Sequence, residues 1–129
     1  MGWARPSILG RDLEVNPSPL RGCLYWVVIP GEVGEKRRPA LVISLDARNR
    51  LAGDVLVIPA SSTLRPAPTH VRLRKGTGGL RKDSVLKCEQ ITTLPKRLLS
   101  ESALGGPLSA VLIEEAERGV LRAIGVPIG

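Results

Sequence analysis

The chain has 129 residues, a length typical of one domain, and its hydrophobic fraction of 43% lies far above that of disordered segments. Aromatic residues make up only 2% and phenylalanine is absent, which indicates an aliphatic core and argues against a row of aromatic platforms for nucleobases. The net charge of +7 and pI ≈ 10.3 come mostly from arginine, whose planar guanidinium suits phosphate oxygens. This balance favours a polyanionic partner, nucleic acid or an acidic protein segment, although a merely soluble basic surface would give it too.

The cysteines and the N-terminus bear on the compartment of the protein. Cys23 and Cys88 each stand alone in an apolar stretch with no CxxC spacing, which predicts buried, reduced thiols. The N-terminus carries no apolar signal segment, and no run approaches the ~18 consecutive apolar residues of a transmembrane helix. We therefore expect a cytoplasmic protein without a membrane partner.

Short strands are predicted along most of the chain. Residues 1–20 hold three prolines and no periodicity, which predicts an N-terminal extension, with the folded domain over 21–129. Residues 46–53 have turn composition with room for a short helical turn, and the basic, glycine-rich segment 75–83 is predicted to be a hairpin turn. Five strands rich in β-branched residues are expected, over 23–29, 39–45, 54–60, 69–74 and 84–91.

The pattern changes near the C-terminus, where an amphipathic helix is predicted. Ser109 is the expected N-cap, and Gly125 is the expected stop. Gly119, inside the helix, costs about 1 kcal/mol relative to alanine or marks a close approach of the backbone. The apolar face comprises Leu112, Ala116, Val120 and Ile124. A series of short strands with a terminal helix predicts a mainly β fold, a small and strongly bent sheet or barrel.

Missing motifs exclude most enzyme classes. A single histidine rules out a His-rich metal site and a two-histidine ribonuclease, and HExxH, P-loop and GxSxG patterns are absent. His70 is therefore expected to be structural, and Asp83 and Glu89 are expected to be solvated or to cap turns. The carboxylates do not cluster as a metal nuclease requires, so neither a metal nor a cofactor is expected.

One hairpin is predicted to bring an arginine and a serine together. If the two residues that flank the turn between strands 39–45 and 54–60 pair, the numbers of paired residues sum to 99. Arg38 then lies opposite Ser61, with Cβ atoms about 5 Å apart. The neighbouring loop and the basic turn would wall the same end of the hairpin. The side chains expected to contact a nucleic acid are Arg37, Ser62, Thr63, Arg65, Arg72, Arg74, Lys75, Arg81 and Lys82.

Five separated blocks of the sequence resemble the MazF/PemK family of toxins from toxin–antitoxin systems, in order and in spacing. They are RGCLYWV (21–27), RRPALVIS (37–44), NRL…DVLVIPASST (49–63), KDSVLKCEQITTL (82–94) and LRAIG (121–125). The resemblance implies an SH3-like barrel of the CcdB/MazF type with a C-terminal helix, and a homodimer. It also implies sequence-selective cleavage of single-stranded RNA without a metal, which leaves 2′,3′-cyclic phosphate and 5′-hydroxyl ends and inhibits translation.

The resemblance also implies roles for particular residues. In the family, an arginine immediately before the proline of the second strand is catalytic, and here Arg38 holds that place. The key hydroxyl follows the third strand, where Ser61 replaces the more usual threonine and loses the methyl group that fixes χ1. Some members carry an assisting glutamate in the first loop, and Glu32 and Glu35 flank the matching position. We expect Arg38 to clamp phosphate oxygens and Ser61 to position the RNA, with either glutamate or water as the proton acceptor.

Two other classes of protein stay open at this point. The same barrel resembles gyrase-poisoning toxins such as CcdB, which act by binding a protein. A small basic barrel could also be a non-catalytic nucleic-acid-binding regulator. The RRP and PASS motifs favour the nuclease over both. A toxin of this kind would need an acidic, MazE-like antitoxin, through which it could also bind operator DNA.

Overall fold

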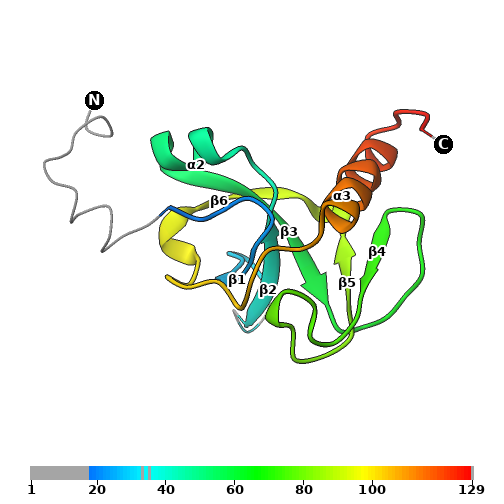
Figure 1. Cartoon of the computed structure of the whole chain (residues 1–129), viewed down its shortest axis with the longest axis horizontal. Helices are drawn as coiled ribbons and strands as arrows, with labels where there is room; N and C mark the ends of the chain where they lie inside the picture. Colours follow the sequence, from blue (N-terminus) through cyan, green and yellow to red (C-terminus); the bar gives the residue numbers. More distant parts are fainter. Residues whose placement is uncertain (1–17, 33, 35, 129) are drawn as a thin grey trace, which may run out of the picture.

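The computed structural model describes residues 18–32, 34 and 36–128, so most of the predicted N-terminal extension lies outside the described residues. In this part of the chain, six strands form a strongly bent antiparallel sheet (Figure 1). The strands are β1 (Leu24–Val28), β2 (Arg37–Val42), β3 (Asp54–Ser61), β4 (His70–Leu73), β5 (Ser84–Lys87) and β6 (Thr92–Pro95). The helices are α2 (Asp46–Leu51), α3 (Ala110–Ala123) and the 3₁₀ turns η3 (Thr77–Gly79), η4 (Cys88–Gln90) and η5 (Lys96–Leu98).

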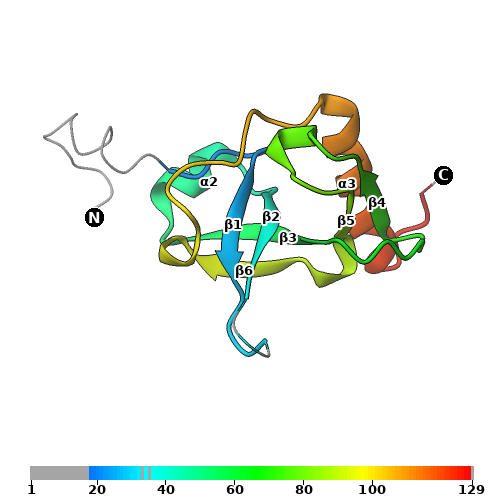
Figure 2. The ribbon, with the colours of Figure 1, turned by 90° about the horizontal axis from the view of Figure 1, so that it is seen from below.

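Strand β3 lies at the centre of the sheet, whose order is β1-β2-β3-β5-β4. Its first four residues pair with β6, residues 57–59 pair with β2 on the other side, and its last two residues pair with β5. Helix α2 lies near one end of the sheet and α3 packs near β4 and β5 at the other (Figure 2). The predicted mainly β fold with a C-terminal helix is confirmed.

The structure differs from the predicted strands in three places. The strand predicted over 39–45 begins at Arg37 and ends at Val42, and the chain turns into α2 soon afterwards. The predicted strand 84–91 ends at Lys87, because Cys88 N donates to Thr69 O (3.0 Å) and the chain turns into η4. Strand β6 was not predicted, since TTLP is short and ends in proline. It pairs with only one neighbour, β3, and proline is tolerated on such an edge strand.

The core consists of two aliphatic clusters, because the bent sheet has side chains packed on both faces. Neighbouring residues of one strand alternate between the clusters, as Leu24 and Tyr25 do. This two-sided burial explains why β1 is a continuous apolar run. Cys23 and Cys88 are buried and free, as predicted.

Helix α3 covers the first of these clusters. Ser109 caps it by accepting a hydrogen bond from Leu112 N (3.2 Å), as predicted. Ala116 is fully buried. Leu112 and Val120 pack against the cluster. Ile124 was wrongly placed on the packing face: it follows the last helical residue and is 68% exposed.

Gly119 marks a close approach between α3 and the sheet. A Cβ added at this position would lie 2.6 Å from Cys88 Sγ. No side chain fits there without a shift, so the interpretation of Gly119 as a close approach is confirmed.

Candidate functional site

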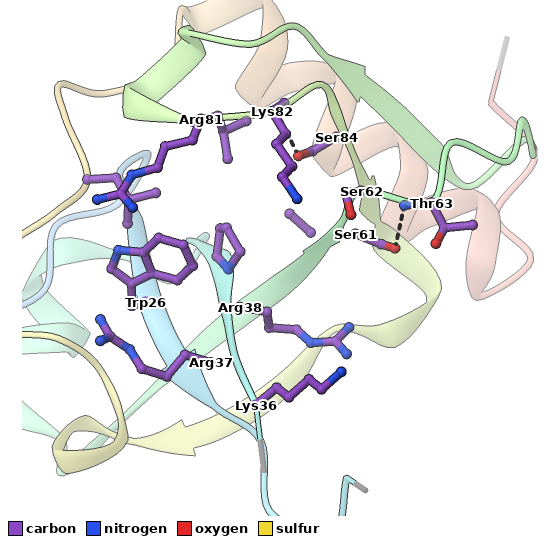
Figure 3. Close-up of a pocket in the computed structure, with 14 residues that line it drawn as sticks. Trp26, Lys36, Arg37, Arg38, Ser61, Ser62, Thr63, Arg81, Lys82 and Ser84 are labelled. Carbon is purple, nitrogen blue, oxygen red and sulfur yellow. Dashed lines mark hydrogen bonds between the residues drawn. The ribbon is translucent and has the colours of Figure 1, made fainter. Parts of the chain in front are cut away.

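A cavity of about 550 Å³ opens at the end of the β2–β3 hairpin, beside the turn that joins β4 to β5 (Figure 3). We call it the basic groove, because all the charged side chains that line it are lysines and arginines and no carboxylate of the described residues lines it. The lining residues are Trp26, Lys36, Arg37, Arg38, Pro39, Ala60, Ser61, Ser62, Thr63, Leu80, Arg81, Lys82, Ser84 and Leu104.

The hairpin register places the predicted pair at the basic groove. The observed β2–β3 pairs run from Val42–Val57 to Ala40–Pro59, and each pair of numbers sums to 99, as predicted. The observed pairs end there, two residues short of Arg38 and Ser61, and both of these residues line the basic groove. Ser61 is also held by pairing with Val85 on the other side of β3. Figure 3 shows Arg38 and Ser61 at the same end of the cavity, away from Trp26.

The Arg38 side chain has hydrogen-bonding capacity to spare. Its Nη2 lies 3.2 Å from Glu32 Oε1, with the two side chains 30% and 28% exposed. This contact is an ion pair by distance, yet Glu32 Oε1 has no partner in hydrogen-bond geometry, and Arg38 Nε is buried without one. Buried donors are almost always satisfied in folded proteins. An acceptor such as a phosphate oxygen would satisfy this one.

Hydroxyl groups also line the basic groove. Ser61 Oγ accepts a hydrogen bond from Thr63 N (3.1 Å), which fixes the start of the loop after β3 and leaves the hydroxyl proton available to donate. Ser84, which was not predicted, lines the basic groove and donates from Oγ to Lys82 O (3.1 Å).

Several predicted residues lie in the basic groove and others do not. Arg37, Ser62, Thr63, Arg81 and Lys82 line it, together with Trp26 and Lys36, which were not predicted. Arg72, Arg74 and Lys75 do not, because they lie on or just after β4, the outer strand, which β5 separates from β3. Arg65 lies in the loop between β3 and β4 and lines a separate pocket with His70. The binding of these four cationic residues to RNA stays a prediction. Glu35 lies outside the described residues.

The single histidine belongs to a structural cluster beyond the basic groove. His70 Nδ1 lies 2.7 Å from Arg65 O, and Nε2 lies 3.2 Å from Glu89 Oε2. Burial raises the pKa of Glu89, but hydrogen bonds from Thr69 and His70 outweigh it and leave this pKa below its usual value. The ring therefore tethers the loop that precedes β4.

Asp83 caps the turn that joins β4 to β5. Asp83 Oδ1 accepts from Lys75 N (2.8 Å), and this bond, followed by one from Arg72, lowers the pKa of Asp83. In the described ranges, no group of three or more His, Cys, Asp or Glu side chains is arranged to hold a metal ion. No helix in the same ranges is long and apolar enough to cross a membrane.

The fold and the basic groove together define a small, barrel-like β protein with a cation-lined cavity. Residues 20–124 match the family described as the PemK-like, MazF-like toxin of type II toxin-antitoxin systems. The chain belongs to this family.

Relatives and solved structures agree with this membership. Endoribonuclease MazF2 of Mycobacterium bovis is 36% identical over 110 residues, which are 81% of this chain and 95% of that protein. Endoribonuclease EndoA of Bacillus subtilis is 34% identical over 86 residues, 63% of this chain and 74% of that protein. A mycobacterial endoribonuclease, solved in complex with its cognate antitoxin, superposes with a TM-score of 0.71 at 27% identity, covering 87% of this chain and 100% of that one.

Proposed function

We propose that this chain is the toxin of a toxin–antitoxin pair, an endoribonuclease that cleaves single-stranded RNA in the basic groove and inhibits translation. The observation that carries the proposal is the presence of Arg38 and Ser61 in one cation-lined groove. Family membership supports it, because the relatives named above are endoribonucleases. The charge of +7 adds the attraction that a phosphate backbone requires.

The reaction we propose uses the RNA itself as the nucleophile and needs no metal. The 2′-oxygen attacks the adjacent phosphorus while the bond from phosphorus to the 5′-oxygen breaks. The 2′-hydroxyl proton passes to a base, and the leaving 5′-oxygen takes up a proton from water or an acid. The products are a 2′,3′-cyclic phosphate and a 5′-hydroxyl, so neither an oxidant nor a cofactor is consumed.

Each residue of the site has a distinct role in this proposal. Arg38 stabilises the charge on the nonbridging phosphate oxygens, because its unpartnered Nε and adjacent Nη atoms form a fork. Guanidinium does not lose its proton readily, so Arg38 does not act as the base. Ser61 hydrogen-bonds the phosphate or the 2′-hydroxyl and aligns the attack. Glu32, in contact with Arg38, is a candidate proton acceptor, together with Glu35 or water.

A cleavage assay tests the proposal directly. Purified protein is incubated with single-stranded RNA in EDTA, and new 5′-hydroxyl ends are labelled with polynucleotide kinase without prior phosphatase. Arg38→Ala should lower the rate at least ~100-fold, in the range seen when one charge-stabilising donor is lost. Ser61→Ala should lower it less, and Ser61→Thr should retain activity because the hydroxyl stays.

The control is Arg118→Ala, which removes an equal charge from α3, where Arg118 lies 4.0 Å from Glu114. This variant should cleave like the parent. Full activity in both Arg38→Ala and Ser61→Ala would remove the proposed site. Intact RNA with the parent protein would instead favour the gyrase poison or the non-catalytic binder.

We further propose a cytoplasmic homodimer that an acidic, MazE-like antitoxin inhibits. The mycobacterial structure with its cognate antitoxin supports such a partner, and the cations of the basic groove suit an acidic segment. Operator DNA would be bound through the antitoxin. Coexpression with the acidic product of a neighbouring reading frame should restore growth and block RNA cleavage, and persistent cleavage in the purified complex would contradict this partner.

A further inference from the structure

Trp26 is a large aromatic residue that the core does not use. The aromatic residues in the described ranges are Tyr25 and Trp26. Tyr25 is buried, and its hydroxyl accepts a hydrogen bond from Leu20 N (2.9 Å). Trp26 belongs to neither core cluster and instead lines the basic groove. A tryptophan gains most of its stabilising energy from burial, so its place at the wall of a polar cavity points to a ligand.

Two arginines from different elements lie against the indole. The guanidinium carbon of Arg37, at the start of β2, lies 5.2 Å from the ring centroid, and that of Arg81, after η3, lies 5.9 Å away. Both arginines are exposed, and neither forms an ion pair with a carboxylate in the described ranges. Figure 3 shows the three side chains together, across the cavity from Ser61 and Thr63.

We propose that Trp26 is a stacking platform for a nucleobase, flanked by Arg37 and Arg81 as phosphate contacts. This inference rests on the proposed function, and it assigns a subsite for the nucleotide next to the scissile phosphate. A base takes its place against the indole, and Arg81, the more distant cation, turns from the ring to the backbone phosphate. Because every base has a π-face, the subsite contributes affinity and alignment at any sequence.

The position of the subsite, at the far end of the cavity from Arg38 and Ser61, would help to orient an RNA strand for cleavage. Arg38 and Ser61 hold the phosphate at one end of the cavity, and a platform at the other end fixes the direction of the strand. The cavity of about 550 Å³ is large enough for a nucleotide-sized ligand. With both ends held, the 2′-oxygen and phosphorus stay aligned at a lower entropic cost.

The test measures binding rather than cleavage, so it does not depend on the proposed chemistry. The probe is a fully 2′-O-methylated decamer of randomised sequence, which cannot attack its own phosphates. Its partner is a decamer with the same phosphates but abasic at every position. The chain has two tryptophans, so Trp3→Phe leaves Trp26 as the only indole fluorophore.

We expect the base-bearing decamer to quench Trp26 fluorescence and the abasic decamer not to. Trp26→Leu should weaken binding of the base-bearing decamer by about 5- to 100-fold and leave the abasic decamer within twofold of the parent, whereas Trp26→Phe should restore most of the loss. Arg81→Ala should weaken both decamers, and Arg118→Ala should weaken neither beyond twofold.

If Trp26→Leu weakened both decamers equally, the proposed subsite would be wrong. It would also be wrong if Trp26→Leu, with an unchanged melting temperature, bound the base-bearing decamer as tightly as the parent. A melting temperature for each variant separates lost stacking from lost folding. If the parent quenches with the base-bearing decamer but cleaves no RNA, the subsite stands and the proposed nuclease activity fails.

Discussion

The two ends of the β2–β3 hairpin differ in whether their buried polar groups have hydrogen-bond partners. At the closed end, next to α2, Ser44 and Asn49 are buried and bonded to each other. Ser44 Oγ donates to Asn49 Oδ1 (2.5 Å) and accepts from Leu56 N (3.0 Å), and Asn49 Nδ2 donates to Ser44 O (3.0 Å). At the open end, Arg38 Nε is buried without a partner.

This difference separates folding from function along a single hairpin. The hydrogen bonds of the closed end hold the connection between β2 and β3, and the register of the two strands leads to the open end, where Arg38 and Ser61 line the same cavity. The open end keeps donors free for a ligand, at some cost in stability. Sites that bind charged ligands often carry such a cost.

Breaking the closed end should give the largest loss of stability. Asn49→Ala removes both the acceptor of the Ser44 hydroxyl and the donor to the Ser44 carbonyl, and leaves buried polar groups unpaired. We expect the free energy of unfolding to fall by about 1–3 kcal/mol, measured by urea denaturation. Arg50→Ala, exposed on the same helix, should change it by less than about 0.5 kcal/mol. Equal effects of the two variants would show that the closed end does not fix the hairpin.

The hairpin also shows how far the sequence predicts this molecule. The register followed from the spacing of two apolar runs, and with it came the pair Arg38 and Ser61. The Ser44–Asn49 network that enforces this register could not be predicted, because segment 46–53 has only an ordinary turn composition. Burial of its asparagine depends on the packing of α2 against β3.

The open end was predicted less completely. Trp26 was missed because both faces of β1 are covered, so Leu24, Tyr25 and Val27 give an unbroken apolar run with no sign of one side chain facing a cavity. Arg72 was placed too near the site, because the sequence does not reveal that β5 lies between β4 and β3. It pairs with Asp83 at 3.3 Å on the outer strand. Strand order, unlike register, depends on long-range contacts.

The buried Cys88 thiol offers a second test of stability, through its dependence on pH. Burial, with a smaller contribution from Glu89, raises the pKa of the Cys88 thiol from 9.0 to about 11. A folded pKa above the unfolded one gives stability that is present below pH 9 and is lost as the pH rises through about 11. We expect the parent to lose about 1–2 kcal/mol more than Cys88→Ala between pH 8 and pH 10.5, measured by urea denaturation at each pH. Parallel curves for the two proteins would mean that this thiol titrates normally in the fold.

The smallest change in the free energy of unfolding is expected at the open end. There the informative result is whether the free energy rises or falls. Arg38→Met alone removes the unpartnered Nε but leaves the partly buried Glu32 carboxylate without its cation, so Glu32→Gln is combined with it. Replacing both poorly satisfied groups should leave the free energy of unfolding unchanged or raise it by up to about 1 kcal/mol. The same double variant should cleave no RNA. A loss of stability as large as that of Asn49→Ala would mean that Arg38 is held by the fold rather than kept free for phosphate.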